Sequence, residues 1–415
     1  MPVCTTGSQT GRKKGARRRI YLQPPSPVPE ALNKGYGARA DRVLLETGAP
    51  PGAERRRGNE FVCRPGGAGR LKFFLKGEIA LFKRKWLSGA VMLLFLLSCF
   101  LAGCGTKPQT QGSTPAKELT GKVIVFHAGS LTEPLKKMSE KFEAEHPGVK
   151  MELEASGSRA AAKKITELHK PCDIMASADY EVIEELLRPQ YTDNNILFAR
   201  NELVIAYTAK SKYANDINSS NWYQILLRPG VNYGRSDENA DPCGYRTLMC
   251  WQLASEFYND PTLYDKLYKN CPPRNIRPKS VELLAMLESG ALDYAFEYKS
   301  VAEQHKLRYV TLPAQINLGD IKYASFYKQA TVQVKGSEPG KMVTYKGTPI
   351  VYGVTLLKDA PNKEAAVAFL RYMLARDGGL KILQEMGQPV LEPPLYLGTL
   401  PPELAGVAQS AQPNK

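Results

Sequence analysis

Between residues 121 and 400, short runs with the period of a β-strand alternate with longer runs that have the period of an α-helix. In one helical run, Leu131, Leu135, Met138 and Phe142 are spaced so that they share one helical face. The pattern predicts strands at Lys122–Phe126, Val149–Ala155, Asp173–Ala178, Glu202–Tyr207, Asp293–Tyr298 and Ile350–Leu357, and further helices at Arg159–Leu168, Tyr180–Leu187 and Pro361–Glu385.

Strands that alternate with helices of this length are typical of α/β proteins with parallel sheets. The patterned region is long for one sheet, so we expect two lobes, each a mixed, mostly parallel sheet flanked by helices. We assign residues 121–207 and 344–400 to lobe 1 and residues 208–343 to lobe 2. The chain then crosses between the lobes near Thr208 and Val343.

The net charge of the chain does not indicate a nucleic-acid-binding protein, although it is +15. Residues 1–80 contain 16 Lys and Arg against 6 Asp and Glu, and Lys83, Arg84 and Lys85 add three more positive charges. The rest of the chain therefore carries only about +2 of the total. Because the positive charge is concentrated at one end, we expect no nucleic-acid partner.

The most specific local pattern is an export signal at residues 81–103. Lys83-Arg84-Lys85 precedes an apolar run from Trp86 to Leu101, and small residues lead to Cys104. This order is typical of a secretory signal peptide, and the run is shorter than the ~20 residues of a membrane-spanning helix. Leu101-Ala102-Gly103-Cys104 resembles the bacterial lipobox, which would make Cys104 the lipidated first residue of the mature protein. A transmembrane anchor is the alternative, and both place the remainder outside the cytoplasm.

The segments around this signal have the composition of unfolded chain. Residues 1–80 are rich in Gly, Pro and Arg, which predicts disorder or a start-site artefact; a genuine basic cytoplasmic tail is the alternative. Residues 104–120 are predicted to be a flexible tether and residues 401–415 a flexible tail. A tethered, exported chain with two α/β lobes suggests a binding protein whose ligand cleft lies between the lobes.

Two corners between a predicted strand and a predicted helix have the residue types of an anion site. At the first, Gly129 allows close backbone approach, and Ser130 with Glu133 forms a capping-box pattern. At the second, Gly157-Ser158 precedes the helix that begins at Arg159. Free N–H groups at helix starts favour anions, so the two corners together indicate an oxyanion site. Each corner alone is equally consistent with ordinary helix capping.

Two further corners carry carboxylates. Asp241 is a good N-cap and Pro242 a favoured first helical residue, so Asp241-Pro242-Cys243 is by itself a well-formed helix start. Glu297 closes the predicted strand Asp293–Tyr298. In parallel α/β sheets such corners line the ligand crevice at the carboxyl ends of the strands. A solvated side chain is the alternative interpretation for each carboxylate.

The run from Gly121 to about Leu400 resembles the tungstate/molybdate-binding proteins of ABC importers, in their archaeal-type branch. The matching pieces are HAGSL at His127–Leu131, SGSR at Ser156–Arg159, DIMASADY at Asp173–Tyr180, NELVIAY at Asn201–Tyr207, DPCGYR at Asp241–Arg246, DYAFEYKSVAEQH at Asp293–His305 and INLGD at Ile316–Asp320. The resemblance implies a type II periplasmic-binding-protein fold. It also implies an ABC permease and its ATPase as partners, no cofactor and no enzymatic activity, and we expect a monomer.

The resemblance also implies roles for the four corners. Ser130 and Ser158, with neighbouring backbone N–H groups, would donate hydrogen bonds to the oxo groups. Asp241 and Glu297 would coordinate tungsten or molybdenum directly. The residues assigned to oxyanion binding are Gly129, Ser130, Ser158, Asp241, Pro242, Cys243 and Glu297.

Two carboxylates beside an oxyanion need a physical explanation, since burying like charges costs several kcal/mol. Tungsten(VI) and molybdenum(VI) can expand from four oxygen ligands to six, so two carboxylate oxygens complete an octahedron by direct bonds. Sulfur and phosphorus do not accept such ligands, so the same pair disfavours sulfate. Arg159 and Arg246 would offset charge nearby or be solvated.

Other functions have weaker support. A receptor for another small oxyanion, such as sulfate, is the nearest alternative, and a lipid-anchored hydrolase that uses Asp241 and Glu297 as acid and base is another. None of the sequences G-x-S-x-G, H-E-x-x-H or the P-loop motif occurs. The histidines show no ligand spacing and no C-x-x-C motif occurs, so a zinc site is not expected. Among the exported cysteines, Cys250 and Cys271 are the first pair to consider for a disulfide.

Overall fold

The computed structural model describes residues 118–411 except Ser337 and Pro339. The predicted disordered segment, the signal peptide, Cys104 and most of the tether therefore lie outside the described residues. Within them, no helix is both long and apolar enough to cross a membrane. All of these residues belong to one compact unit.

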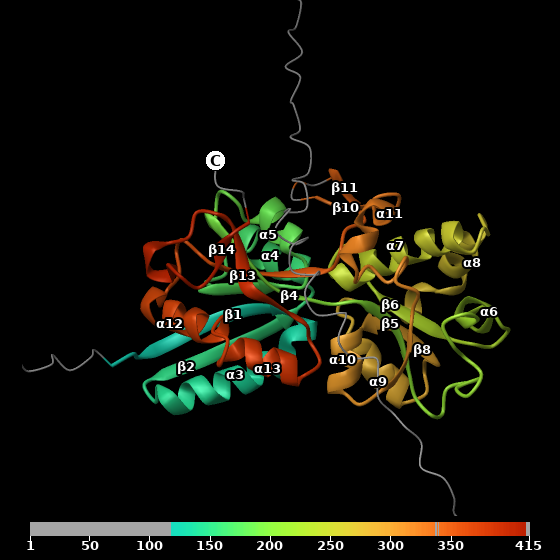
Figure 1. Cartoon of the computed structure of the whole chain (residues 1–415), viewed down its shortest axis with the longest axis horizontal. Helices are drawn as coiled ribbons and strands as arrows, with labels where there is room; N and C mark the ends of the chain where they lie inside the picture. The colour runs from blue at the N-terminus through green and yellow to red at the C-terminus, as the bar shows by residue number, and fades with distance from the viewer. Residues whose placement is uncertain (1–117, 337, 339, 412–415) are drawn as a thin grey trace, which may run out of the picture. The chain divides into compact units, whose positions relative to one another are not determined.

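A seven-stranded mixed sheet forms the first part of this unit, which we call lobe 1 (Figure 1). Parallel pairing joins β1 to both β2 and β3, while β12 runs antiparallel between β3 and β4. The strand order is β14-β13-β4-β12-β3-β1-β2, with bounds Gly121–Ala128 for β1, Val149–Ser156 for β2, Ile174–Ser177 for β3, Asn194–Arg200 for β4, Val351–Leu356 for β12, Val390–Gly398 for β13 and Gln409–Ser410 for β14.

Helices cover both faces of this sheet. Val123 and Val125 of β1 pack with Leu135 and Met138 of α3, while Phe126 faces a separate cluster under α4 and α5. Burial on both faces explains why the central strands β3 and β12 are almost continuously apolar. The lobe 1 helices are α3 (Thr132–Glu145), α4 (Ser158–Thr166), α5 (Tyr180–Leu186), α12 (Lys363–Met373) and α13 (Gly379–Glu385), with short 3-10 turns at Gly129–Leu131 and Pro402–Leu404.

A five-stranded sheet with the order β7-β6-β8-β5-β9 forms lobe 2. The long helix α7 packs against β5, β6 and β8, and its residues Met249, Trp251 and Leu253 are buried in the lobe 2 core. The bounds are Leu203–Tyr207 for β5, Trp222–Leu226 for α6, Tyr233–Ser236 for β6, Pro242–Phe257 for α7, Leu263–Asn270 for α8, Ile276–Arg277 for β7, Glu282–Glu288 for α9, Tyr294–Tyr298 for β8, Lys299–Gln304 for α10, Arg308–Thr311 for β9 and Ala324–Tyr327 for α11, with 3-10 turns at Pro273–Asn275 and Ile321–Tyr323.

The two-lobed α/β fold with mixed sheets is confirmed, but the sheets are not mostly parallel: among the described residues, lobe 1 has three parallel and three antiparallel strand pairs, and lobe 2 has two of each. The predicted crossing points are also not where the chain crosses. β5 lies in the five-stranded sheet, so the chain leaves lobe 1 at Asn201-Glu202 and not near Thr208. It returns at residues 347–350, after the hairpin of β10 (Thr331–Lys335) and β11 (Met342–Lys346). Only two residues separate β4 from β5, which is why the apolar pattern gave no sign of a boundary there.

Two other predictions are corrected. The helical pattern at Pro361–Glu385 is two helices, because the chain turns at Gly378-Gly379. A Cβ on Gly379 would lie 2.4 Å from the Met373 carbonyl oxygen, so only glycine fits this turn. Residues 401–411 of the predicted flexible tail are folded onto lobe 1, since β14 pairs with β13 and Leu404 is buried.

The lobes touch each other directly at two glycines. A Cβ on Gly157 would lie 2.3 Å from the carbonyl oxygen of Ala240 in lobe 2, and a Cβ on Gly129 would lie 3.0 Å from the Val281 side chain. The Ala240 carbonyl also accepts hydrogen bonds from the N–H groups of Arg159 and Ala160 at 3.1 and 3.2 Å. The two glycines therefore permit close approach of the opposite lobe.

Candidate functional site

The first corner lies at the end of β1, but its capping box does not form. A 3-10 turn intervenes, and α3 begins at Thr132 with no side chain capping it. The Ser130 hydroxyl instead lies 2.8 Å from the hydroxyl of Tyr352 on β12. Tyr352 also accepts a hydrogen bond from the Asn201 side-chain amide at 3.2 Å. Ser130 is thus free of a local capping role and joined to residues at the crossing between lobes.

The second corner places Ser158 as the first residue of α4, fully buried. Its Oγ accepts a hydrogen bond from the Ala178 N–H at 3.0 Å, which fixes it against the end of β3. Two of the helix-start N–H groups expected to favour an anion, those of Arg159 and Ala160, are already bonded to the Ala240 carbonyl. The hydroxyl proton of Ser158 is therefore a better candidate donor here than those two N–H groups.

The third corner follows the predicted capping geometry. Asp241 is the N-cap of α7, and its Oδ1 accepts from the Cys243 N–H at 3.0 Å. Its Oδ2 accepts from the Ser280 N–H at 2.8 Å, and Pro242 takes the first helical position. Burial raises the pKa of Asp241 to about 6, although the two N–H groups favour its charged form.

The fourth corner holds the most isolated carboxyl group of the set. Glu297 is the last residue but one of β8 and is completely buried; its Oε1 accepts from the Tyr298 N–H at 2.8 Å. Within residues 118–411, Oε2 is buried and has no hydrogen-bond partner. Burial, together with the charge of Asp241, raises the pKa of Glu297 to about 8, although the Tyr298 N–H and the Ser280 hydroxyl favour the charged form.

The structure brings these four corners together. Asp241 acts electrostatically on Glu297, and both carboxylates act electrostatically on the Cys243 thiol. Glu297 in turn acts on Tyr352, which holds Ser130. The Ala240 carbonyl connects the second corner to the third. Residues from both lobes thus lie within electrostatic reach of two buried carboxyl groups, an arrangement that suits a small ligand able to bond to carboxylate oxygen.

Sequence reasoning missed several members of this group. Tyr352, Asn201 and Ser280 are polar and buried, yet none belongs to the four corners singled out in the sequence. Tyr298 is buried, and its hydroxyl has no partner among the described residues. Ser130 and Tyr352 are 222 positions apart, so local pattern gave no signal of their contact. Ser280 could have been suspected only from its place before α9.

Arg159 and Arg246 were expected to offset the charge of the site carboxylates or to be solvated, and they do neither. Arg159 and Arg246 are buried, so neither is solvated. Arg159 pairs with Glu185 at 2.7 Å and Arg246 with Asp179 at 2.5 Å, so neither pairs with a site carboxylate. Their charges are compensated by other carboxylates, and Asp241 and Glu297 have no salt-bridge partner among the described residues.

The predicted disulfide is wrong. Cys172, Cys243, Cys250 and Cys271 are all free and buried. Cys271 directs its Sγ toward the Tyr233 carbonyl of β6, while Cys250 packs in the core cluster of α7. The region described also contains no group of three or more His, Cys, Asp and Glu side chains that could hold a metal ion.

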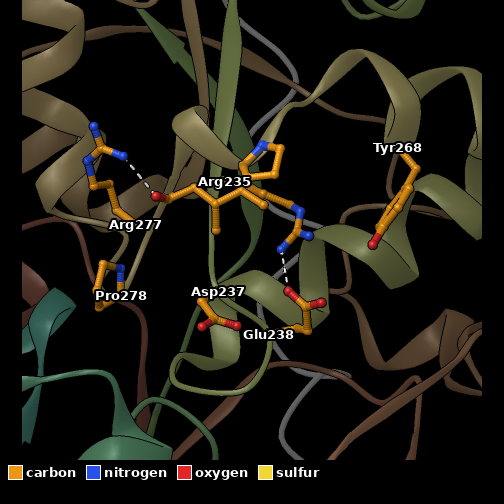
Figure 2. Close-up of a pocket in the computed structure, with 8 residues that line it drawn as sticks. Arg235, Asp237, Glu238, Tyr268, Arg277 and Pro278 are labelled. Carbon is orange, nitrogen blue, oxygen red and sulfur yellow. Dashed lines mark hydrogen bonds and ion pairs between the residues drawn. The ribbon is translucent and has the colours of Figure 1, made fainter.

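A separate pocket of about 390 Å³ opens on lobe 2 (Figure 2). Figure 2 shows Arg235 donating to Glu238 across it, at 2.6 Å, and Arg277 donating to a backbone carbonyl. None of the predicted site residues lines this pocket. Arg235 pairs with Glu238, Arg277 donates to backbone carbonyls and Asp237 accepts from Asn239, so these charged groups already have partners and we assign the pocket no ligand.

The raised pKa of Glu297 predicts a pH-dependent stability for the ligand-free protein. Between the ordinary value of 4.5 and about 8, the folded protein holds a proton that the unfolded chain has released. The free energy of unfolding therefore falls as pH rises through this interval. Glu297→Gln is neutral at every pH and should lose less stability between pH 5 and pH 8.5.

Thermal melting of both proteins at pH 5, 6.5 and 8.5 tests this. The melting temperature of the variant minus that of the wild type should increase with pH. A constant difference would mean that Glu297 titrates normally in the folded protein.

Comparison with known proteins places the chain in a family. Residues 123–387 match the model of bacterial extracellular solute-binding proteins. A solute-binding protein of Petrotoga mobilis is 51% identical over 279 residues, which are 67% of this chain and 87% of that protein. The molybdate/tungstate-binding protein WtpA of Thermococcus kodakarensis is 44% identical over 342 residues, 76% of this chain and 95% of that protein.

A more distant likeness comes from the solved structures. The periplasmic molybdate-binding protein of Azotobacter vinelandii aligns with 64% of this chain and 98% of its own, with a TM-score of 0.48 and 17% identity. A likeness this distant supports no inference about the ligand. The family match and the two closely similar relatives are sufficient: this chain belongs to the family of bacterial extracellular solute-binding proteins.

Proposed function

We propose that this protein captures tungstate or molybdate outside the cytoplasm and delivers it to an ABC importer. The relative from Thermococcus kodakarensis and another from Pyrococcus abyssi, each 44% identical to this chain, are named as molybdate/tungstate-binding proteins. The oxyanion is cargo, and no cofactor is part of the proposal. Members of the family are solute-binding proteins, so we propose no catalytic activity.

One observation carries the choice of ligand: the buried Oε2 of Glu297, which has no partner in the described region, beside a second buried carboxyl group, Asp241. Two buried carboxylates without a paired cation are costly. A tungsten(VI) or molybdenum(VI) centre that expands its coordination would bond to one oxygen of each. The repulsion between oxyanion and carboxylates would then be replaced by two metal–oxygen bonds.

The hydroxyl groups supply donors for the oxo groups. Asn201 donates to Tyr352, so Tyr352 can donate to Ser130, and the proton of Ser130 remains for the ligand. Ser158 accepts from Ala178 and likewise keeps its own proton to donate. Gly129, Pro242 and Cys243 complete the proposed oxyanion-binding set as backbone neighbours of these side chains.

The two alternatives explain less of the geometry. A sulfate receptor has no use for two carboxyl groups at the ligand, because sulfur does not accept their oxygens. A hydrolase that uses Asp241 and Glu297 as acid and base has no support from the family, whose members are solute-binding proteins. Turnover of model esters or glycosides would favour the hydrolase.

We further propose that the protein is a monomer anchored to the membrane by lipid on Cys104. The family is extracellular, which agrees with the export signal, and the partners would be a permease and its ATPase. The anchor rests on the sequence Leu101-Ala102-Gly103-Cys104 alone.

Replacing each carboxylate by its neutral isostere tests metal coordination. Asp241→Asn keeps an oxygen for capping α7, and Glu297→Gln keeps the shape of the side chain. Loss of a metal–oxygen bond should weaken tungstate binding by more than ~3 kcal/mol, over about a hundredfold. Ser130→Ala removes one neutral hydrogen bond, ~1 kcal/mol, and should cost roughly fivefold.

Sulfate is the control anion in this experiment. Calorimetry at pH 8.5, where both carboxyls are ionised, should show that each isosteric variant binds sulfate as well as or better than the wild type, since a repulsive charge has gone. Parallel loss of tungstate and sulfate, or loss of neither, would show that the carboxylates are not metal ligands.

Lipid anchoring is tested by Cys104→Ser. The variant should fold but leave the membrane fraction, because it lacks the thiol that carries the lipid. Mass spectrometry of the wild-type protein from membranes should find lipid on Cys104; an unmodified Cys104 there would end this proposal.

A further inference from the structure

The side chain of Asp179 in lobe 1 receives hydrogen bonds from two side chains of lobe 2. Its Oδ2 accepts from the Tyr245 hydroxyl at 2.7 Å and from Arg246 Nη2 at 2.5 Å. Both Asp179 and Arg246 are only 1% exposed. Because the partners belong to different lobes, these bonds exist only when the lobes are together.

The same carboxylate also has a task within its own lobe. Asp179 is the N-cap of α5, and its Oδ1 accepts from the Glu181 N–H at 3.0 Å. The two oxygens therefore divide their roles, Oδ1 within lobe 1 and Oδ2 toward lobe 2. A substitution that keeps Oδ1 can remove the second role while leaving the first.

Arg246 also donates hydrogen bonds to the segment through which the chain returns to lobe 1. Its Nη1 donates to the Thr348 carbonyl at 2.7 Å and to the Thr348 hydroxyl at 3.0 Å. Thr348 lies in residues 347–350, where the chain crosses back to lobe 1. Arg246 is therefore fixed in direction by the crossing segment, and Asp179 meets a guanidinium that is already oriented.

Tyr245 and Arg246 stand in the first turns of α7, the helix whose N-cap is Asp241. The bonds to Asp179 therefore hold to lobe 1 the same helix start that presents a proposed metal ligand. The contact of Gly157 with Ala240, one residue before Asp241, brings the lobes together at the same place.

We propose that Asp179 is a positioning residue that latches the lobes closed through Tyr245 and Arg246 and thereby holds Asp241 at the ligand. This inference rests on the proposed function for its second half, the effect on ligand, while the latch itself requires no ligand. The latch adds to the stability of the closed state whether or not the cleft is filled. When the lobes part, water replaces the interlobe hydrogen bonds. Loss of the latch therefore destabilises only the closed state.

Asp179→Asn tests the latch in the purified full-length protein. The amide oxygen can still cap α5, but the charge that pairs with Arg246 is gone. Asp173→Asn is the matched control: Asp173 is also buried in lobe 1, at the opposite end of β3, and accepts only from backbone N–H groups of its own lobe, those of Ile124 and Asn362.

The first measurement needs no tungstate. Fluorophores on noncanonical amino acids at Glu140 of α3 and Lys269 of α8, both exposed, report the distance between lobes by energy transfer. Asp179→Asn should shift the ligand-free population toward larger distances, and Asp173→Asn should match the wild type. Equal populations in all three proteins would overturn the latch, even if the protein binds tungstate as proposed.

The second measurement follows tungstate by stopped flow. Asp179→Asn should release tungstate about tenfold faster or more, as expected for loss of hydrogen bonds to a charged group, with an association rate equal to or above that of the wild type. Asp173→Asn should leave both rates within about twofold of the wild type. Equal acceleration by both variants, or slower association alone, would contradict a latch and indicate a general loss of lobe 1 structure.

Arg246→Met provides an independent check that does not depend on the cap of α5. The double variant, which also carries Asp179→Asn, should release tungstate at most about twofold faster than the faster of the two single variants. Both changes remove the same interaction, so their effects should not multiply. Multiplicative effects would show that the two residues act separately and would refute the latch. If no variant or wild-type protein binds tungstate, the proposed function fails, and the energy-transfer result still decides the latch.

Discussion

The structure depends on one electrostatic constraint: two carboxyl groups, Asp241 and Glu297, are buried close to each other, and neither has a salt-bridge partner among the described residues. Water cannot screen them, and burial raises the pKa of both side chains. Backbone N–H groups hold three of their four oxygens, which orients the groups without neutralising them. The remaining oxygen, Oε2 of Glu297, is the position at which a bound electrophilic centre would relieve the constraint.

The fold provides this burial by joining two lobes around a helix start. α7 caps itself with Asp241 on one side and reaches Asp179 of lobe 1 through Arg246 on the other. Glycine at position 157 lets the backbone of lobe 1 approach Ala240 closely enough to exclude a side chain. The contacts between the lobes and the proposed metal ligand Asp241 therefore lie within a few residues at the start of one helix.

Local chemistry predicted a good part of this arrangement. Asp241 and Pro242 form the helix start expected of them, and the alternation of strands and helices gave the two-lobed α/β fold. The contact of Ser130 with Tyr352 and the division of β4 from β5 could not be predicted, because both depend on partners far along the chain. The apparent capping box at Ser130 failed because Ser130 lies inside a 3-10 turn that precedes α3.

The most direct test of the account is X-ray absorption at the tungsten edge of the protein with bound tungstate. Coordination by Asp241 and Glu297 predicts six oxygens around tungsten, four short oxo bonds and two longer ones. The two longer bonds should fall to one in Asp241→Asn or Glu297→Gln at saturating tungstate. A spectrum of four equivalent short oxygens in the wild-type protein would contradict the account, because tungstate would then be held as a tetrahedral anion.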